Sequence, residues 1–323
     1  MSRKDFGGKP PAQSYVAVVG AVNLDIWGQS EKGIILHDSN PGAIRFSVGG
    51  VGRNIAHNLA LLGVQVEMLT ALGGDIWAAA VEKSCTESGI GLREAIRIPD
   101  GRTSGYLYVS GPDGEMTLGI CDAEIVENVS PDVILQKLDF LNLADIVVMD
   151  GNLSAETIEC IAKHCTSPLF ADPVSTTKAE KMRAVLPHIH TFKPNTLEAE
   201  ALTGQSDPEK AARELVRRGV KRVFVSDGEN GVFAAEGTDC IHIPCCKTQL
   251  VNCTGGGDAV MAALCKSYLD GRDTEAAARY AMAAGAIAVE SAETISQEMN
   301  EKNVLSRIDW TPILLRRYHN GNS

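Results

Sequence analysis

The chain has 323 residues, of which 44% are hydrophobic and 22% charged, and this composition is typical of a globular protein large enough to be an enzyme by itself. Its formal net charge of −11 argues against a nucleic-acid partner, because phosphate backbones attract basic surfaces. It has no apolar run long enough to span a bilayer. We therefore expect neither nucleic acid nor a membrane as a partner, and a small ligand instead.

The nine cysteines are scattered and odd in number, which is typical of reduced thiols in a cytoplasmic protein. Their spacing matches no metal-ligand pattern. Residues 1–14 mix charge, glycine and proline without the apolar stretch of a secretory signal. We predict a flexible tail there, a second tail at 311–323, and one domain over 15–310.

Short β-branched or apolar runs alternate with helical patterns along the chain, beginning with 16–19, 64–69 and 146–149. This alternation predicts an α/β fold with a mainly parallel sheet. The polar residues that follow these runs are expected to meet at the carboxyl edge of the sheet. They are Asn23, Asp25, Asp150, Asp172, Lys193, Asn195, Ser226 and Asp227.

Two stretches, 33–48 and 101–121, break this rhythm with alternating, strand-like sequence. The second contains a turn at 111–114, Gly-Pro-Asp-Gly, which favours a hairpin. We predict a small antiparallel lid, a device that keeps water away from a reacting phosphate.

The first glycine-rich segment is Gly49–Asn54, followed by an Ala-rich helix from Ile55. Glycines before a helix often only form a tight turn. The Asn54 amide, however, suits sugar hydroxyls, and Asn23-Leu24-Asp25 at the end of the first strand offers a matching carboxylate. Asp25 as a simple turn former is the alternative.

The segment Lys193-Pro194-Asn195 precedes a helix that is expected to begin near Thr196, which places Glu198 at its third position. Two interpretations remain open. Asn195 and Glu198 form a structural capping box, or they orient Mg²⁺ and the nucleotide phosphates through water.

The turn Ser226–Gly231 lies between two strand-like runs. It is either an ordinary hairpin or part of a nucleotide site. The sequence has no Gly-x-x-x-x-Gly-Lys-Ser/Thr motif, so any ATP site is built differently from a P-loop.

The most informative segment is Cys253-Thr254-Gly255-Gly256-Gly257-Asp258, which opens a helix of small residues. Backbone N–H groups and the helix dipole converge there, which suits a phosphate. A carboxylate at an anion site makes chemical sense if it takes a proton from a hydroxyl that attacks phosphorus. The segment predicts phosphoryl transfer to an alcohol, with Asp258 as the general base.

Taken together, Asn23-Leu24-Asp25, Gly49–Asn54, Asn195-x-x-Glu198 and Thr254–Asp258 resemble the ribokinase-type (PfkB) carbohydrate and nucleoside kinases, in order and spacing, over about residues 15–310. Within that family, Asp38–Gly42, Leu59–Gly63 and Lys193–Glu200 make the chain most similar to the pseudouridine kinases.

The resemblance implies a three-layer α/β/α sandwich with a β lid that often mediates homodimerisation, and ATP-dependent phosphorylation of a sugar hydroxyl with Mg²⁺. Carried over to this sequence, Asp258 is the base and Gly255, Gly256 and Gly257 form the anion hole. Asn23, Asp25, Gly50 and Asn54 hold the ribose. The ATP and Mg²⁺ region takes Lys193, Asn195, Glu198, Ser226, Gly228 and Thr254.

Two residues in or next to the glycine segment depart from the family pattern. Gly256 occupies a position usually held by alanine, which preserves the N–H donors. Asn252 replaces an aspartate that helps many relatives bind a monovalent cation, which puts potassium activation in doubt.

The substrate remains the open question. A buried acceptor for the extra ring N–H of pseudouridine would reject uridine strongly. Residues in or beside the lid offer one, although each is equally a solvated loop residue: Ser39, Asn40, Thr103, Ser104 and Asp122. The alternatives are a kinase of the same family for another nucleoside or a free sugar, and a catalytically silent nucleoside-binding protein.

Overall fold

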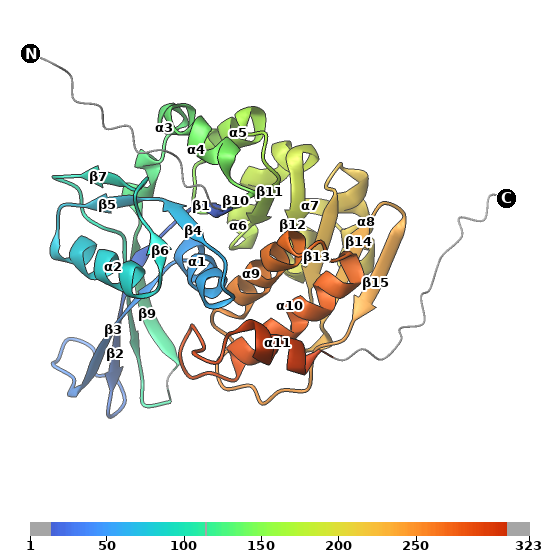
Figure 1. The fold of residues 1–323 in the computed structure, drawn as a ribbon. Helices are drawn as coiled ribbons and strands as arrows, with labels where there is room; N and C mark the ends of the chain where they lie inside the picture. Colours follow the sequence, from blue (N-terminus) through green and yellow to red (C-terminus); the bar gives the residue numbers. More distant parts are fainter. Residues whose placement is uncertain (1–13, 114, 309–323) are drawn as a thin grey trace, which may run out of the picture.

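The computed structural model describes residues 14–113 and 115–308 (Figure 1). Apart from Ser14, the tails expected at 1–14 and 311–323 lie outside these residues. So do residues 309 and 310 of the predicted domain.

A nine-stranded sheet runs through the middle of the molecule. In spatial order its strands are β15 (Asp239–Ile243), β14 (Val232–Glu236), β13 (Arg222–Ser226), β12 (Ile189–Phe192), β11 (Leu169–Asp172), β10 (Ile146–Asp150), β1 (Val16–Val19), β4 (Val66–Leu69) and β6 (Ile90–Gly91). The strands from β13 to β6 pair in parallel, whereas β14 pairs antiparallel with both of its neighbours. The carboxyl ends of the parallel strands therefore share one edge.

Strand β1 explains why the sheet is covered on both faces. Its residues are apolar throughout and all buried, and successive side chains of a strand point to opposite faces. Val16 and Val18 join one hydrophobic cluster, and Ala17 and Val19 join the other. A continuous apolar strand of this kind needs a layer of helices on each side.

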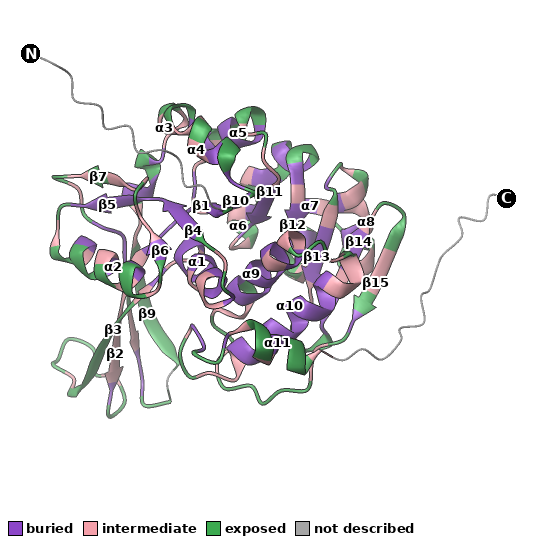
Figure 2. Cartoon of the chain, viewed as in Figure 1, coloured by how far each residue is buried: buried purple, intermediate pink, exposed green. Residues whose placement is uncertain are grey.

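The helices form these two outer layers. One cluster packs α1 (Val51–Leu61), α2 (Ile76–Glu87), α9 (Gly256–Leu269), α10 (Thr274–Val289) and α11 (Glu301–Arg307) over one face. The other packs α3 (Pro131–Gln136), α4 (Leu138–Leu143), α5 (Ala155–His164), α6 (Thr176–Ala179), α7 (Thr196–Thr203) and α8 (Pro208–Arg217) with the 3₁₀ helices η1 (Glu124–Asn128) and η2 (Glu180–His188). Burial concentrates on the strands and the helix faces turned toward them (Figure 2). The predicted three-layer α/β/α fold is confirmed.

In the part of the chain that the structure describes, none of these helices has the length and apolarity that crossing a bilayer requires.

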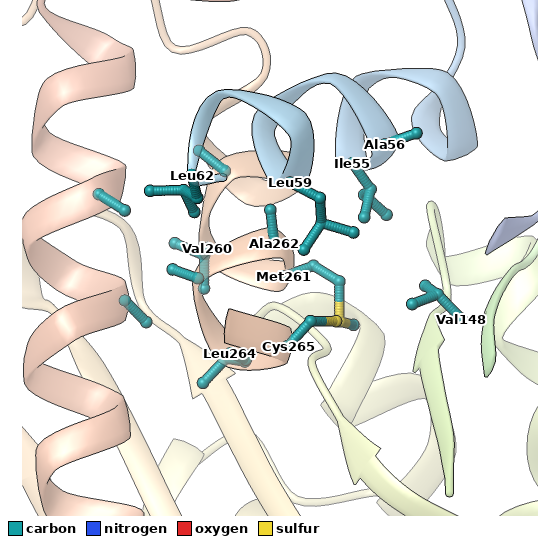
Figure 3. Packing of buried hydrophobic residues seen from close by; sticks show 14 of the residues in the cluster. Ile55, Ala56, Leu59, Leu62, Val148, Val260, Met261, Ala262, Leu264 and Cys265 are labelled. Carbon is teal, nitrogen blue, oxygen red and sulfur yellow. The ribbon is translucent and has the colours of Figure 1, made fainter. Parts of the chain in front are cut away.

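Helix α1 packs directly on α9, and this contact fixes the site described below. Ile55 and Leu59 of α1, with Leu62 just after it, meet Val260 and Met261 of α9 in one buried cluster (Figure 3). Alanines on α9 keep the two helices close. Residues at the beginnings of both helices are thereby held in a rigid frame.

A separate four-stranded sheet forms the lid, with the order β3 (Gly42–Gly49), β2 (Asn23–Ser30), β8 (Gly105–Ser110) and β9 (Met116–Asp122). The sheet is mixed rather than antiparallel as predicted, because its central strands β2 and β8 pair in parallel. It projects from the body at the lower left of Figure 1. Strands β3, β8 and β9 lie in or next to the stretches 33–48 and 101–121, and residues 33–41 form the loop before β3. A further small sheet pairs β5 (Ala71–Gly73) with β7 (Ile96–Ile98).

Strand β2 corrects the sequence-based prediction for Asn23 and Asp25. The first strand ends at Val19, and both residues belong to the lid rather than to the end of that strand. Gly20 allows the change of direction, because a Cβ at this position would collide with the carboxylate of Asp150. The pattern missed the break because the residues between the two strands, Ala21 and Val22, are apolar and buried.

Candidate active site

The glycine segment forms the beginning of α9. Gly255 is the N-cap residue with φ 82°, and a Cβ there would collide with the carbonyl oxygen of Thr294. Helix α9 begins at Gly256, so the last two glycines already belong to the helix. Gly257 and Asp258 therefore lie in the first turn, whose N–H groups have no partner within the helix. This end of the helix can receive an anion.

Asp258 lies at the same place, and its residue is only 9% exposed. Its Oδ2 accepts a hydrogen bond of 2.9 Å from Nδ2 of Asn54, at the start of α1. Burial and the negative charge of Asp172 raise the pKa of Asp258 to about 7. A carboxyl group with this pKa takes up a proton near neutral pH, as a general base must.

Asn54 connects the sugar motif to the glycine turn. Helix α1 begins at Val51 rather than at Ile55, so Asn54 lies in its first turn as a buried residue. Nδ2 of Asn54 donates to Asp258, whereas its Oδ1 is buried and has no hydrogen-bond partner among the described residues. An unpaired buried acceptor costs free energy unless a ligand donates to it. A sugar hydroxyl fits this requirement.

Gly50 precedes α1 with φ 98°, and a Cβ would lie 2.6 Å from the carbonyl oxygen of Ala21. Only glycine fits there. Gly50 thus brings the start of α1 close to the segment that leads into Asn23.

Asp25 is half-buried on β2, opposite Ser47 of β3. Its Oδ1 accepts a hydrogen bond from Nδ2 of Asn23. Burial raises the pKa of Asp25 to about 6, against the opposing effects of Asn23 and the guanidinium of Arg53. A carboxylate poised in this way is a strong acceptor for a pair of sugar hydroxyls.

Lys193 and Asp172 form a buried ion pair at the carboxyl ends of β12 and β11, with 3.1 Å between Nζ and Oδ2. A Cβ at Gly257 would lie 3.3 Å from Nζ of Lys193, so the ammonium group lies beside the glycine turn. Asp150, at the end of β10, is buried as well, and burial raises its pKa to about 6. The ammonium group of Lys193 thus lies beside the turn, and the negative charges of Asp172 and Asp150 both act on Asp258.

Asn195 and Glu198 form the capping box of α7. Oδ1 of Asn195 accepts from the N–H of Glu198, and Oε2 of Glu198 accepts from the N–H of Asn195. The structural interpretation is therefore correct, although a capping box does not exclude a second role. Burial raises the pKa of Glu198, and Lys193 opposes this effect.

A cavity of about 560 Å³ opens beside the glycine turn. It is lined by Ser226, Gly228, Glu229, Gly231, Cys245, Cys246, Lys247, Thr248, Leu250, Cys253, Gly256, Gly257, Val260, Met282, Gly285 and Val289. Its volume and its apolar wall suit a purine, and Gly256 and Gly257 of the glycine turn are among the residues that line it. The turn Ser226–Gly231 is thus both a hairpin and part of this cavity wall.

Several cavity residues had no signal in the sequence. Cys245, Leu250, Met282 and Val289 come from a loop and from α10, and they are ordinary apolar residues in patterns that point to packing. Only the topology, which folds α10 back along α9, brings them to the glycine turn.

None of the residues predicted to recognise the base is among those that line the cavity beside the glycine turn. Ser39 and Asn40 lie in the loop between β2 and β3, where Oδ1 of Asn40 accepts from the N–H of Ile35. The Thr103 hydroxyl is buried between Asp75 and the N–H of Gly73. These contacts support the local fold.

Asp122 pairs with Arg102 at the end of β9, 3.1 Å apart. Ser104 differs from the other candidates, because its hydroxyl is buried without a hydrogen-bond partner in the described part of the chain. It is the residue just before β8, and its carbonyl oxygen accepts from the N–H of Leu24 in β2. The hydroxyl thus lies near the lid strand that carries Asp25.

A helix N-terminus with a buried carboxyl group, next to a cavity large enough for a purine, suits a phosphotransferase with an alcohol acceptor. The chain belongs to the pfkB family of carbohydrate kinases, whose model matches residues 13–302. The predicted family and enzyme class are confirmed. A solved structure of the same fold, a putative ribokinase II from E. coli at 18% identity and a TM-score of 0.79, contains the predicted cofactors ATP and Mg²⁺.

Two relatives from Escherichia coli (strain K12) are similar over most of the chain. A pseudouridine kinase is 35% identical over 305 residues, covering 92% of this chain and 97% of that protein. An uncharacterized sugar kinase is 34% identical over 304 residues, covering 92% and 84%. Among solved structures, a putative sugar kinase from Clostridium perfringens superposes with a TM-score of 0.82 at 30% identity, covering 91% of this chain and 95% of that one.

Proposed function

We propose that the protein is an ATP-dependent kinase that phosphorylates the 5′-hydroxyl of pseudouridine, giving pseudouridine 5′-phosphate and ADP. The observation that carries the proposal is the contact between Asn54 and Asp258, which joins the sugar motif to the predicted base at the anion site. The similarity to a pseudouridine kinase over 92% of the chain supports the choice of nucleoside.

In the proposed mechanism, Asp25 and the free Oδ1 of Asn54 bind ribose hydroxyls and orient the 5′-hydroxyl toward Asp258. Asp258 takes the hydroxyl proton as the oxygen attacks the γ-phosphorus and the bond to the β-phosphate oxygen breaks. The amides at the start of α9 stabilise the charge on the transferred group. General-base assistance is worth about 10²–10⁴-fold, and one anion-hole donor roughly 10²–10³-fold.

The cavity beside the turn would hold the nucleotide, and its apolar wall includes Val260, Met282 and Val289. Bound Mg²⁺ would supply positive charge to neutralise the phosphates. No cluster of three acidic, His or Cys side chains suited to a metal exists among the described residues, which fits a cation that keeps waters and phosphate oxygens as ligands. Asn195 and Glu198 would orient those waters, with the one Glu198 oxygen that the capping box leaves free.

A substrate panel tests this function. With ATP and Mg²⁺ in excess, we expect ADP release to be fastest with pseudouridine, and at least tenfold slower with uridine in terms of kcat/KM. The panel also contains guanosine, ribose and fructose. Equal rates with uridine and pseudouridine would refute the substrate while leaving the kinase assignment intact.

A sugar kinase is the second candidate, because a sugar kinase is almost as similar in sequence. Preferential phosphorylation of a free sugar in the same panel would establish it. A silent nucleoside-binding protein would release no ADP with any acceptor. The presence of Asp258 argues against a silent nucleoside-binding protein, since binding alone needs no base.

The lid supports a homodimer. Ile44, Phe46, Leu107, Leu118 and Ile120 are exposed on one face of the lid, with Phe46 at 66% and Ile120 at 59%. The strand register aligns them across the sheet, and Asp25 points to the opposite face. An apolar face of this kind fits a second copy of the chain.

Light scattering after size-exclusion chromatography measures the oligomeric state. We expect a dimer for the wild type and a monomer for the double variant Phe46→Asp, Ile120→Asp. Leu143→Asp, on the exposed side of α4, is the control and is expected to stay dimeric. A monomeric wild type at micromolar concentration would contradict the proposal.

Potassium independence is a further expectation. Oδ1 of Asn252 accepts from the N–H of Thr254, and its Nδ2 donates to the carbonyl oxygen of Ala292. This neutral amide ties the glycine turn to the neighbouring loop without a cation. We expect kcat to change less than twofold between KCl and NaCl, and Asn252→Asp to introduce activation by potassium. Several-fold activation of the wild type by potassium would contradict this role.

The cytoplasmic location predicted from the cysteines stays a prediction.

A further inference from the structure

Asp172 makes two contacts that together define its environment. Its Oδ2 is 3.1 Å from Nζ of Lys193, and both side chains are only 6% exposed. Its Oδ1 accepts a hydrogen bond of 2.9 Å from the N–H of Val174. The carboxylate is thus held at both oxygens.

Val174 has φ 68°, a left-handed conformation that is rare for a β-branched residue. Such strain persists only where the surroundings impose it, and it concentrates at functional sites. The N–H of Val174 is what fixes the orientation of the Asp172 carboxylate. The strained turn therefore serves the ion pair.

The pair lies against the anion site. Nζ of Lys193 would be 3.3 Å from a Cβ at Gly257, and Gly257 lines the nucleotide cavity. An ammonium group has three N–H bonds, so the pairing with Asp172 leaves donors for a phosphate oxygen. A free lysine side chain is flexible and loses rotamer entropy when it binds, and the buried partner fixes it in advance.

We propose that Asp172 is a positioning residue, which holds the ammonium group of Lys193 against the glycine turn as the fixed cation for the transferred phosphoryl group. This inference rests on the proposed function of the site as a phosphotransferase. It assigns the cation to the protein itself, in addition to Mg²⁺.

The charge of Asp172 and its proposed positioning role predict opposite effects of Asp172→Asn on γ-phosphate binding, so one measurement distinguishes them. Asp172→Asn removes a negative charge near the phosphate, so charge alone predicts tighter binding of the γ-phosphate. A positioning role predicts weaker binding, because Lys193 is released. The measurement is the ratio of the dissociation constants of ADP and β,γ-methylene ATP, determined by calorimetry with Mg²⁺.

We expect this preference for the ATP analogue to fall about tenfold in Asp172→Asn and in Lys193→Met. An unchanged or increased preference in Asp172→Asn would overturn the inference. Glu236→Gln, which breaks the Arg222 pair at the far end of β13 and β14, is the matched control. It is expected to keep the wild-type preference. This titration needs no acceptor, so it stays informative if every acceptor in the panel fails.

Turnover with an accepted alcohol gives a second readout. We expect Lys193→Met to lower kcat roughly 10²-fold, as the loss of one stabilising donor does, and Asp172→Asn to lower it about tenfold. If Asp172 acts through Lys193, the double variant loses no more than Lys193→Met. Losses that multiply in the double variant would show that Asp172 acts independently, through the turn alone, and would overturn the inference. If Asp172→Asn does not fold, Asp172→Glu provides the calorimetric test, because it keeps the charge but displaces the carboxylate; an unchanged preference for the ATP analogue in this variant would overturn the inference.

Discussion

Replacement of Asp258 by Asn is expected to lower kcat by at least 10²–10⁴-fold, because the amide keeps the volume of the side chain but cannot accept the hydroxyl proton. The dissociation constant of the nucleoside should stay within about threefold, since Asn54 retains a partner at position 258. Steady-state turnover and calorimetric titration measure the two quantities separately. Near-normal turnover would contradict the assignment of Asp258 as base.

The raised pKa of Asp258 links this variant to pH. In the wild type, kcat/KM should fall as the pH drops through about 7, because the base becomes protonated. The same raised pKa affects the stability of the fold in the opposite direction, so stability falls where activity rises with pH. A carboxyl group whose folded-state pKa is raised stabilises the fold below its unfolded pKa, and this contribution is lost as the pH rises through the folded pKa.

At pH 8 the buried Asp258 carboxylate therefore destabilises the wild type. Asp258→Asn should melt about 2 °C or more above the wild type there, and the difference should shrink toward pH 5. Differential scanning fluorimetry across this pH range checks the expectation. Equal melting temperatures at pH 8 would mean that the carboxylate is well solvated.

Replacement of Asp25 by Asn is expected to lower kcat/KM for the nucleoside roughly 10²–10⁴-fold. The carboxylate is proposed to accept two sugar hydroxyls, and each hydrogen bond to a charged group is worth about 1.5–3 kcal/mol. The Km for ATP should hardly change, because the nucleotide cavity contains no residue of the lid. Initial rates with each substrate varied in turn separate the two effects.

Glu31→Gln provides the matched control, since this exposed carboxylate directly follows β2. It is expected to keep kcat/KM within twofold of the wild type. A loss in Asp25→Asn no larger than in this control would exclude Asp25 from the sugar site. Because the pKa of Asp25 is about 6, nucleoside affinity should also decline as the pH falls below 6 and the carboxylate becomes protonated.

The sheet and the glycine turn were predictable because their signals are local. Apolar runs such as Val16–Val19 and the glycines before Asp258 carry their conformational meaning in a few neighbouring residues. Strand β2 was not predictable in the same way. It follows β1 after only three residues, two of them apolar and buried, so no polar gap marks the change of sheet.

The site was predictable only in part for a related reason. Motif residues such as Asn54 and Asp258 are separated by 204 positions, and only the packing of α1 on α9 brings them into contact. The role of Asp172 depends on one side-chain distance, which no spacing along the chain encodes. The cavity wall, made of Leu250, Val260 and Met282, has no sequence feature that distinguishes it from core.

The lid is attached to the body along a single edge. In its register, Asn23 faces Gly49, Leu24 faces Gly105, and Gly105 faces Asp122, so every lid strand enters or leaves at the same end. Strand β3 also runs into α1 with only Gly50 between them. A swing of the lid about this edge would therefore act on the first turn of α1, and hence on the Asn54 amide that donates to Asp258. If the lid moves when product leaves, the support that Asn54 gives to the Asp258 carboxyl group moves with it.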